Sequence, residues 1–189
     1  MSSALRQPMT MEEFLAWEER QEPRWEFDGF HPVAMTGGTE AHSLIQSNLI
    51  TALSVRLRGS PCRVHGSHLK IKASSSIRYP DAFVLCGPVQ RDSTVAAPPI
   101  VVFEIISPSA SGTDRILKAR EYGETASIQR YVILEQTRQA ATVFARDTGL
   151  WAGLVVTGDV DLPMPEIGIS LPLAGLYLDI PLPPENEAE

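Results

Sequence analysis

Apolar and polar residues follow one another along the chain with two spacings, one typical of helices and one typical of strands. Apolar residues at three- and four-residue intervals, or a threonine able to cap a first turn, mark three segments as helices. These segments are 10–20, 39–58 and 113–124. In the first, Glu13 follows Thr10 by three residues, which is a capping-box pattern. We therefore expect three helices, capped by Thr10, Thr39 and Thr113.

Between the helical segments, short apolar runs predict β-strands. They lie near residues 62–65, 68–72, 79–86, 100–106, 130–135, 140–146 and 151–156. An Asp-Gly pair between two further runs predicts an N-terminal hairpin over residues 25–35. Residues 167–180 predict a last strand and a short turn or helix. This order of elements predicts a mixed α+β fold, in which helices flank a central mixed sheet.

Length and composition favour one globular domain. The chain has 189 residues, of which 43% are hydrophobic and 21% are charged. We expect a single domain over residues 1–189, with flexible tails at 1–8 and 181–189. No apolar run approaches the roughly 20 residues that span a bilayer, so no membrane partner is expected. Cys62 and Cys86 do not form a Cys-x-x-Cys pair, which favours reduced thiols and a cytoplasmic location.

Charge is unevenly distributed along the chain. The net charge of −7 by itself argues against a nucleic-acid partner. Residues 54–146, however, carry 13 Lys or Arg against 7 Asp or Glu. A locally basic region can contact phosphates whatever the total charge, because binding depends on the local field. Most of these side chains are expected to solvate helix and strand faces, so the support for a nucleic-acid partner is weak.

Two carboxylates lie in or beside apolar runs that otherwise predict buried strands. Glu104 is the single polar residue of 100–106, and both faces of that strand are otherwise apolar. Asp81 directly precedes the apolar run 82–86. Burying a carboxylate costs several kcal/mol unless it is compensated, and a divalent cation shared by two neighbouring strands would compensate both.

Each carboxylate also has a simpler interpretation. Asp81, which follows a proline, could cap a turn, and Glu104 could pair with Arg115 or Arg78. For each residue taken alone, the simpler interpretation is favoured. Taken together, with a helix following the second strand, the two carboxylates favour a site.

The same residues carry a resemblance to a known family. The Pro-Asp dipeptide at 80–81, a strand with an inward Glu104 and a following helix resemble the core of the PD-(D/E)xK nuclease superfamily. The chain resembles the Uma2 (DUF820) family of restriction-type endonucleases more closely. The matching stretches are 10-TMEEFLAWEE-19, 24-RWEFDG-29, His42, 79-YPDAFVL-85, 98-PPIVVFEIISPSASGTDRILKAREYGE-124 and 131-YVILE-135. The resemblance implies a restriction-endonuclease-like core with an additional N-terminal hairpin and C-terminal strands.

The resemblance also implies roles for three residues. Asp81 and Glu104, with the carbonyl of Ile105, would hold Mg²⁺ or Mn²⁺, and Lys118 would act on the attacking water. In the parent motif the lysine lies two residues after the strand glutamate, where this chain has Ile106. Lys118 resembles a migrated replacement, and lysine differs from the 13 arginines of this chain in having a pKa that neighbours can shift. The alternative is an exposed helix lysine that pairs with an aspartate one turn away.

Two further residues, Glu26 and His42, are candidates of second rank. The resemblance places Glu26 near the metal, although pairing with Arg24 or Arg63 would explain it equally well. His42, in the first turn of its helix, could orient a phosphate or a carboxylate. Tyr122 is expected to pack in the core rather than to bond near the site.

The implied function is metal-dependent hydrolysis of phosphodiester bonds in DNA by a homodimer. The alternative is a non-catalytic nucleic-acid-binding or protein-interaction module on the same scaffold, because fold alone does not fix function. A phosphodiesterase that acts on RNA or on a small nucleotide is a third possibility.

Overall fold

The computed structural model describes residues 8–35, 37–106, 112–146 and 149–182. Its centre is a six-stranded mixed sheet in the order β10-β9-β8-β7-β6-β3. The strands are β3 (Cys62–Gly66), β6 (Ala82–Cys86), β7 (Val101–Ile106), β8 (Arg130–Glu135), β9 (Ala140–Ala145) and β10 (Ala152–Thr157). The predicted tails lie almost wholly outside the described residues. The predicted mixed α+β fold with a central sheet is confirmed.

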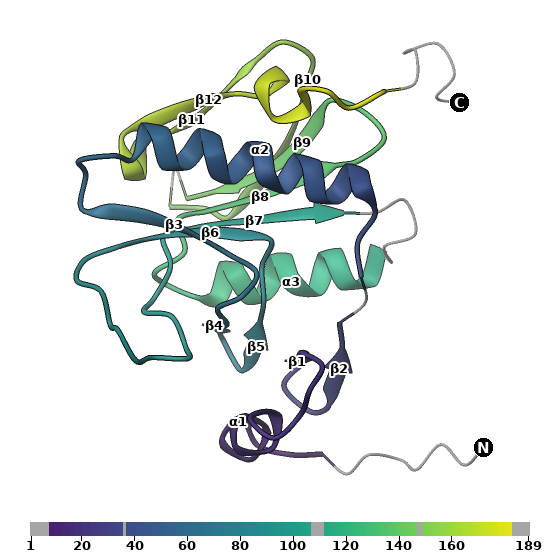
Figure 1. Ribbon diagram of the computed structural model, residues 1–189, viewed down its shortest axis with the longest axis vertical. Helices are drawn as coiled ribbons and strands as arrows, with labels where there is room; N and C mark the ends of the chain where they lie inside the picture. Colours follow the sequence, from purple (N-terminus) through teal and green to yellow (C-terminus); the bar gives the residue numbers. More distant parts are fainter. Residues whose placement is uncertain (1–7, 36, 107–111, 147–148, 183–189) are drawn as a thin grey trace.

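One helix covers each face of the central sheet (Figure 1). Helix α2 (Glu40–Arg56) buries Ile45, Leu49 and Leu53, which repeat every four residues and so form one apolar stripe. Helix α3 (Gly112–Glu124) connects β7 to β8, the one parallel pair among the described strands of this sheet. A parallel pair needs such a crossover connection.

The threonine caps are only partly as predicted. Thr10 forms the complete capping box of α1 (Met11–Glu18), and the Thr39 hydroxyl accepts the His42 backbone N–H at 3.1 Å. Helix α3 begins at Gly112, so Thr113 lies inside the helix and the prediction that it precedes the first turn is wrong. A capping residue is recognised by its non-helical backbone, which a Thr in a Gly-Thr-Asp context does not specify.

A second, smaller sheet lies with α1 on the α3 side of the central sheet (Figure 1). Its order is β2-β1-β5-β4, formed by β1 (Trp25–Phe27), β2 (Pro32–Ala34), β4 (Ile71–Ala73) and β5 (Ser76–Arg78). The predicted hairpin is confirmed: β1 and β2 pair antiparallel, and the Asp28 carboxylate accepts two backbone N–H groups in the loop.

The strands predicted at 68–72 and 79–86 are placed differently. The chain turns at Ser74, whose φ is +51°, and β5 then pairs back on β4. The next strand, β6, begins only at Ala82 because Pro80 has no N–H to donate to a ladder. Asp81 therefore stands just before a central strand, at the point where the chain passes from the small sheet to the large one.

The C-terminal part adds a two-stranded sheet of β11 (Asp161–Met164) and β12 (Ile169–Pro172). Two short 3-10 helices, η1 (Pro165–Ile167) and η2 (Ala174–Tyr177), accompany these strands. The strand and short helix predicted over 167–180 are confirmed as β12 and η2. Strand β11 is not predicted because Pro163 interrupts its short pattern. Within the described residues, no helix has the length and apolar character needed to cross a membrane.

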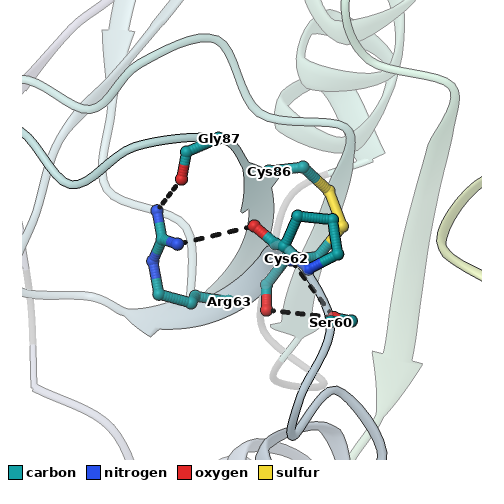
Figure 2. The surroundings of a disulfide bond; sticks show 6 residues. Ser60, Cys62, Arg63, Cys86 and Gly87 are labelled. Atoms are coloured by element: carbon teal, nitrogen blue, oxygen red, sulfur yellow. Dashed lines mark hydrogen bonds between the residues drawn. A yellow bond between two sulfur atoms is a disulfide. The ribbon is translucent and has the colours of Figure 1, made fainter.

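Cys62 and Cys86 form a disulfide, so the expectation of reduced thiols is wrong (Figure 2). The two cysteines are directly opposite one another in the antiparallel β3–β6 pair. Next to them, the Arg63 guanidinium donates to the carbonyl of Gly87 at 2.6 Å. The pairing follows from strand register across 24 residues of sequence, which motif spacing does not reveal.

Candidate active site

Asp81 and Glu104 meet at one end of the β6–β7 pair. These strands pair Ala82 with Phe103, so the same register continued by one residue sets Asp81 opposite Glu104. The Asp81 Oδ2 atom accepts the backbone N–H of Ile105 at 2.7 Å. The two carboxylates that sequence patterning had singled out are therefore neighbours across two central strands.

Helix α2 contributes the second partner of Asp81. The His42 Nε2 atom lies 2.8 Å from Asp81 Oδ1, and the first turn of α2 lies beside the C-terminal end of β7 (Figure 1). The hydrogen bond to Asp81 raises the pKa of His42, although partial burial opposes the shift. Gln46, one turn later, donates to the Asp81 backbone carbonyl at 2.7 Å. His42 is thus a partner of the carboxylate rather than an isolated helix-start histidine.

Behind His42 lies a residue that sequence reasoning missed. The Gln136 amide nitrogen lies 3.4 Å from His42 Nδ1, and its oxygen accepts the Thr39 hydroxyl at 2.6 Å. The cap of α2 is in this way connected through Gln136 and His42 to Asp81. Gln136 directly follows β8, which pairs with β7, and no pattern in the sequence indicated this position.

Glu104 is buried, and it accepts hydrogen bonds from side chains of α3. One of its oxygens, Oε1, lies 3.1 Å from Lys118 Nζ and accepts the Tyr122 hydroxyl at 3.0 Å. Burial raises the pKa of Glu104 to about 7, and the neighbouring Asp81 and Glu26 carboxylates add to the rise while Lys118 opposes it. Arg78, one of the two arginines that the sequence suggested as a partner of Glu104, bonds Glu26 and Glu121 instead.

Lys118 points to the carboxylates. Its Nζ atom lies between Glu104 Oε1, at 3.1 Å, and Glu26 Oε2, at 3.6 Å, and its side chain is 13% exposed. Burial works against the charge, but Glu104 and Glu26 raise the pKa of Lys118 above its ordinary value. The group is therefore an ammonium that donates hydrogen bonds. The alternative of an exposed helix lysine is wrong.

Tyr122 both packs in the core and hydrogen-bonds to Glu104. The residue is fully buried and packs in the core beneath the central sheet, in contact with the Tyr131 ring. Its hydroxyl nevertheless reaches Glu104. Lys118 and Tyr122 are four residues apart on α3 and therefore project from the same face of the helix.

Glu26 lies on β1 of the small sheet, and its side chain reaches Lys118 beside Glu104. Its Oε1 atom accepts the Tyr79 backbone N–H at 3.1 Å, and its Oε2 atom accepts from Arg78 at 3.1 Å. The pairing with Arg24 or Arg63 considered from the sequence does not occur, because these arginines donate to backbone carbonyls elsewhere. Glu26 instead shares Lys118 with Glu104.

Arg78 is a second residue that sequence reasoning missed as part of the site. Its side chain is 2% exposed, and its guanidinium bonds Glu26 on one side and Glu121 of α3 on the other. Such a buried arginine needs carboxylate partners, since an unpaired buried charge is very unfavourable. The partners of Arg78 depend on the tertiary packing, so the sequence, which offered Arg78 only as a possible partner of Glu104, does not reveal them.

The donor set suits a hard divalent cation. Among the described residues, no group of three or more His, Cys, Asp or Glu side chains is arranged to hold a metal ion. Asp81 and Glu104 supply two carboxylates, which is the number of protein carboxylates that Mg²⁺ commonly takes. Burial is the main cause of the raised pKa of Glu104, because it removes water from the ionised carboxylate. A divalent cation bound here would stabilise the ionised form of Glu104.

Comparisons with known proteins identify the family of this chain. The model of the Uma2 family, described as "Putative restriction endonuclease", matches residues 11–174. The uncharacterised protein slr1290 of Synechocystis is 33% identical over 173 residues, which cover 89% of this chain and 91% of that protein. A second uncharacterised Synechocystis protein, sll1609, is 26% identical over 133 residues, covering 68% and 75%.

A solved structure shares the fold. It is the crystal structure of a protein from Anabaena variabilis, described as "a putative nuclease belonging to DUF820". It matches with a TM-score of 0.75 and 20% sequence identity, covering 90% of this chain and 98% of that one. At this identity the likeness shows the fold alone.

Proposed function

Because the chain belongs to the Uma2 family, we propose that it is a metal-dependent endonuclease that hydrolyses phosphodiester bonds in DNA. The observation that carries the proposal is the convergence of Asp81, Glu104 and Lys118 at the end of two central strands. Two carboxylates with an ammonium beside them suit a reaction in which negative charge develops on a phosphate.

In this proposal Asp81 and Glu104 hold Mg²⁺ or Mn²⁺, which when bound supplies a Lewis acid for the phosphate and lowers the pKa of a water. His42 and the Ile105 N–H fix the two oxygens of Asp81. Lys118, as an ammonium, donates a hydrogen bond to the attacking water or to a phosphate oxygen. A positioned donor of this kind is worth about 10²–10³ in rate.

The test is nicking of supercoiled plasmid DNA by purified protein with Mg²⁺ or Mn²⁺. We expect wild-type protein to nick, and the Asp81→Ala and Lys118→Ala variants to lose at least about 100-fold in rate. Addition of EDTA should stop the reaction. Equal nicking by wild type and both variants would reveal a contaminating nuclease and would overturn the proposal.

A metal titration separates an enzyme from a non-catalytic binding module. If Asp81 and Glu104 hold the ion, Mn²⁺ should raise the melting temperature of wild type but not of Asp81→Ala. A non-catalytic module would show no Mn²⁺-dependent shift in either protein, and one that binds nucleic acid would retain DNA binding in both.

We further propose that the active form is a homodimer, because two sites related by a two-fold axis can cut both strands of a duplex. Light scattering during gel filtration measures this state directly, and a monomeric mass at working concentration would contradict it. We also propose a cytoplasmic location, where the proposed DNA substrate would be accessible. The Cys62–Cys86 disulfide is the feature that argues against that compartment.

A further inference from the structure

Glu26 has its two oxygens committed before any ion arrives. Oε1 accepts the Tyr79 backbone N–H, and Oε2 accepts from the Arg78 guanidinium, each at 3.1 Å. Both donors are buried, and Arg78 is in turn fixed by two bonds of 2.8 Å to Glu121. Glu26 is thereby paired with a permanently charged guanidinium, so its charge is compensated without a cation. Asp81 is also bonded at both oxygens, but by His42 and a main-chain N–H rather than by an arginine.

Lys118 shares its ammonium between Glu26 and Glu104. The Glu104 distance is the shorter, 3.1 Å against 3.6 Å. A cation bound to Glu104 would repel the ammonium and compete for the same carboxylate. Glu26 then offers Lys118 a second negative partner, which does not move because Arg78 and Tyr79 hold it.

The charged side chains around Lys118 pair in a way that gives Glu26 positively charged partners without a metal ion. The cationic side chains Arg78 and Lys118 match the carboxylates of Glu26 and Glu121. Asp81 and Glu104 remain as the two carboxylates without an arginine or lysine of their own in this pairing, and His42 is the hydrogen-bonding partner of Asp81. If Glu26 were a ligand of the ion, Lys118 would lose the partner that keeps its ammonium beside the reacting groups.

We infer that Glu26 is a positioning residue for Lys118, held in place by Arg78, and not a ligand of the metal ion. The inference rests on the proposed function for its catalytic consequence. Its structural content, the coupling of Glu26 to Lys118, holds in the protein without metal and is tested separately.

The experiment compares Glu26→Gln, Glu104→Gln and Lys118→Met with wild type, and uses Glu22→Gln as a matched control at an exposed glutamate of the neighbouring segment. Three quantities are measured: plasmid nicking, the Mn²⁺ concentration at half-maximal thermal shift, and the melting temperature without metal. We expect Glu26→Gln to leave the Mn²⁺ midpoint within about twofold of wild type. Glu104→Gln should raise that midpoint at least about tenfold.

Nicking should fall in Glu26→Gln nearly as far as in Lys118→Met, and the double variant should fall no further than Lys118→Met. In the metal-free protein, the melting-temperature losses of the two single variants should not add in the double variant, because the residues are in contact. If Glu26→Gln proves unfolded, Glu26→Asp keeps the charge, shortens the side chain, and is expected to show the same unchanged Mn²⁺ midpoint.

A tenfold or larger rise of the Mn²⁺ midpoint in Glu26→Gln or Glu26→Asp, equal to that of Glu104→Gln, would show a metal ligand and overturn the inference. Additive melting-temperature losses would overturn it as well. If wild type neither nicks nor responds to Mn²⁺, the proposed function fails. The metal-free melting temperatures alone then decide the inference, with non-additivity supporting it and additivity overturning it.

Discussion

Reduction of the Cys62–Cys86 disulfide should destabilise the protein by an amount that follows from the length of the closed loop. The bond joins residues 24 positions apart. In the chain-entropy treatment, opening a loop of this length raises the entropy of the unfolded chain by roughly 12 cal/mol/K, or about 3.5 kcal/mol at 25 °C. The folded state should change little, because β3 and β6 remain paired over five residue positions.

The assay is urea unfolding followed by tryptophan fluorescence, with and without dithiothreitol. For a chain of this size, about 3.5 kcal/mol also corresponds to roughly 7–14 °C in melting temperature. The control is the Cys62→Ser/Cys86→Ser variant, whose unfolding midpoint should match that of the reduced protein and should not respond to dithiothreitol. A thiol titration of the urea-unfolded protein should find no free thiols before reduction.

Two outcomes would refute this reasoning. Free Cys62 and Cys86 thiols in unfolded protein purified without reductant would show that the bond does not form. An intact bond whose reduction leaves the urea midpoint unchanged would show that the unfolded chain does not gain the entropy assigned to it.

Three further predictions concern the site. Arg78→Met should destabilise the fold by about 3–5 kcal/mol in urea unfolding, because it leaves two buried carboxylates without their partner; a loss under about 1 kcal/mol would contradict that pairing. Tyr122→Phe should cost about 1 kcal/mol by the same assay, since one hydroxyl donor to Glu104 is lost. His42→Ala should weaken Mn²⁺ binding about 10–100-fold in thermal-shift titration, because Asp81 loses the partner that orients it; an unchanged midpoint would remove His42 from the site.

The elements that sequence patterning predicted correctly are those whose signal is local. Helix α2 has an apolar stripe that repeats every four residues, and the hairpin at 25–35 has an Asp-Gly pair between two strands. Strand β5 gave no such signal, because three residues that end in a buried arginine do not alternate. Its existence depends on pairing with β1 and β4 rather than on its own composition.

The site residues also divide into those that a local sequence pattern predicts and those that depend on long-range packing. The neighbourhood of Asp81 and Glu104 was predictable, because one carboxylate in each of two apolar runs needs a common compensation. The direction of Lys118 depends on the rotation of α3 against the sheet, which no local pattern specifies. The partners of Arg78 and the Cys62–Cys86 bond depend on register and packing between segments far apart in sequence, so sequence reasoning could not reach them.

Helix α3 has a consequence for how the site tolerates length changes. Lys118, Glu121 and Tyr122 all reach the cluster from one face of α3, so a single rotation of the helix sets three contacts. Deleting one helical residue before Lys118 turns everything after it by about 100° and shortens the helix by about 1.5 Å. All three contacts would be lost together. A lysine on the strand, at the position of Ile106, would not have tied the ammonium to the register of a helix; in this chain α3 can change its exposed side chains freely, but not its length.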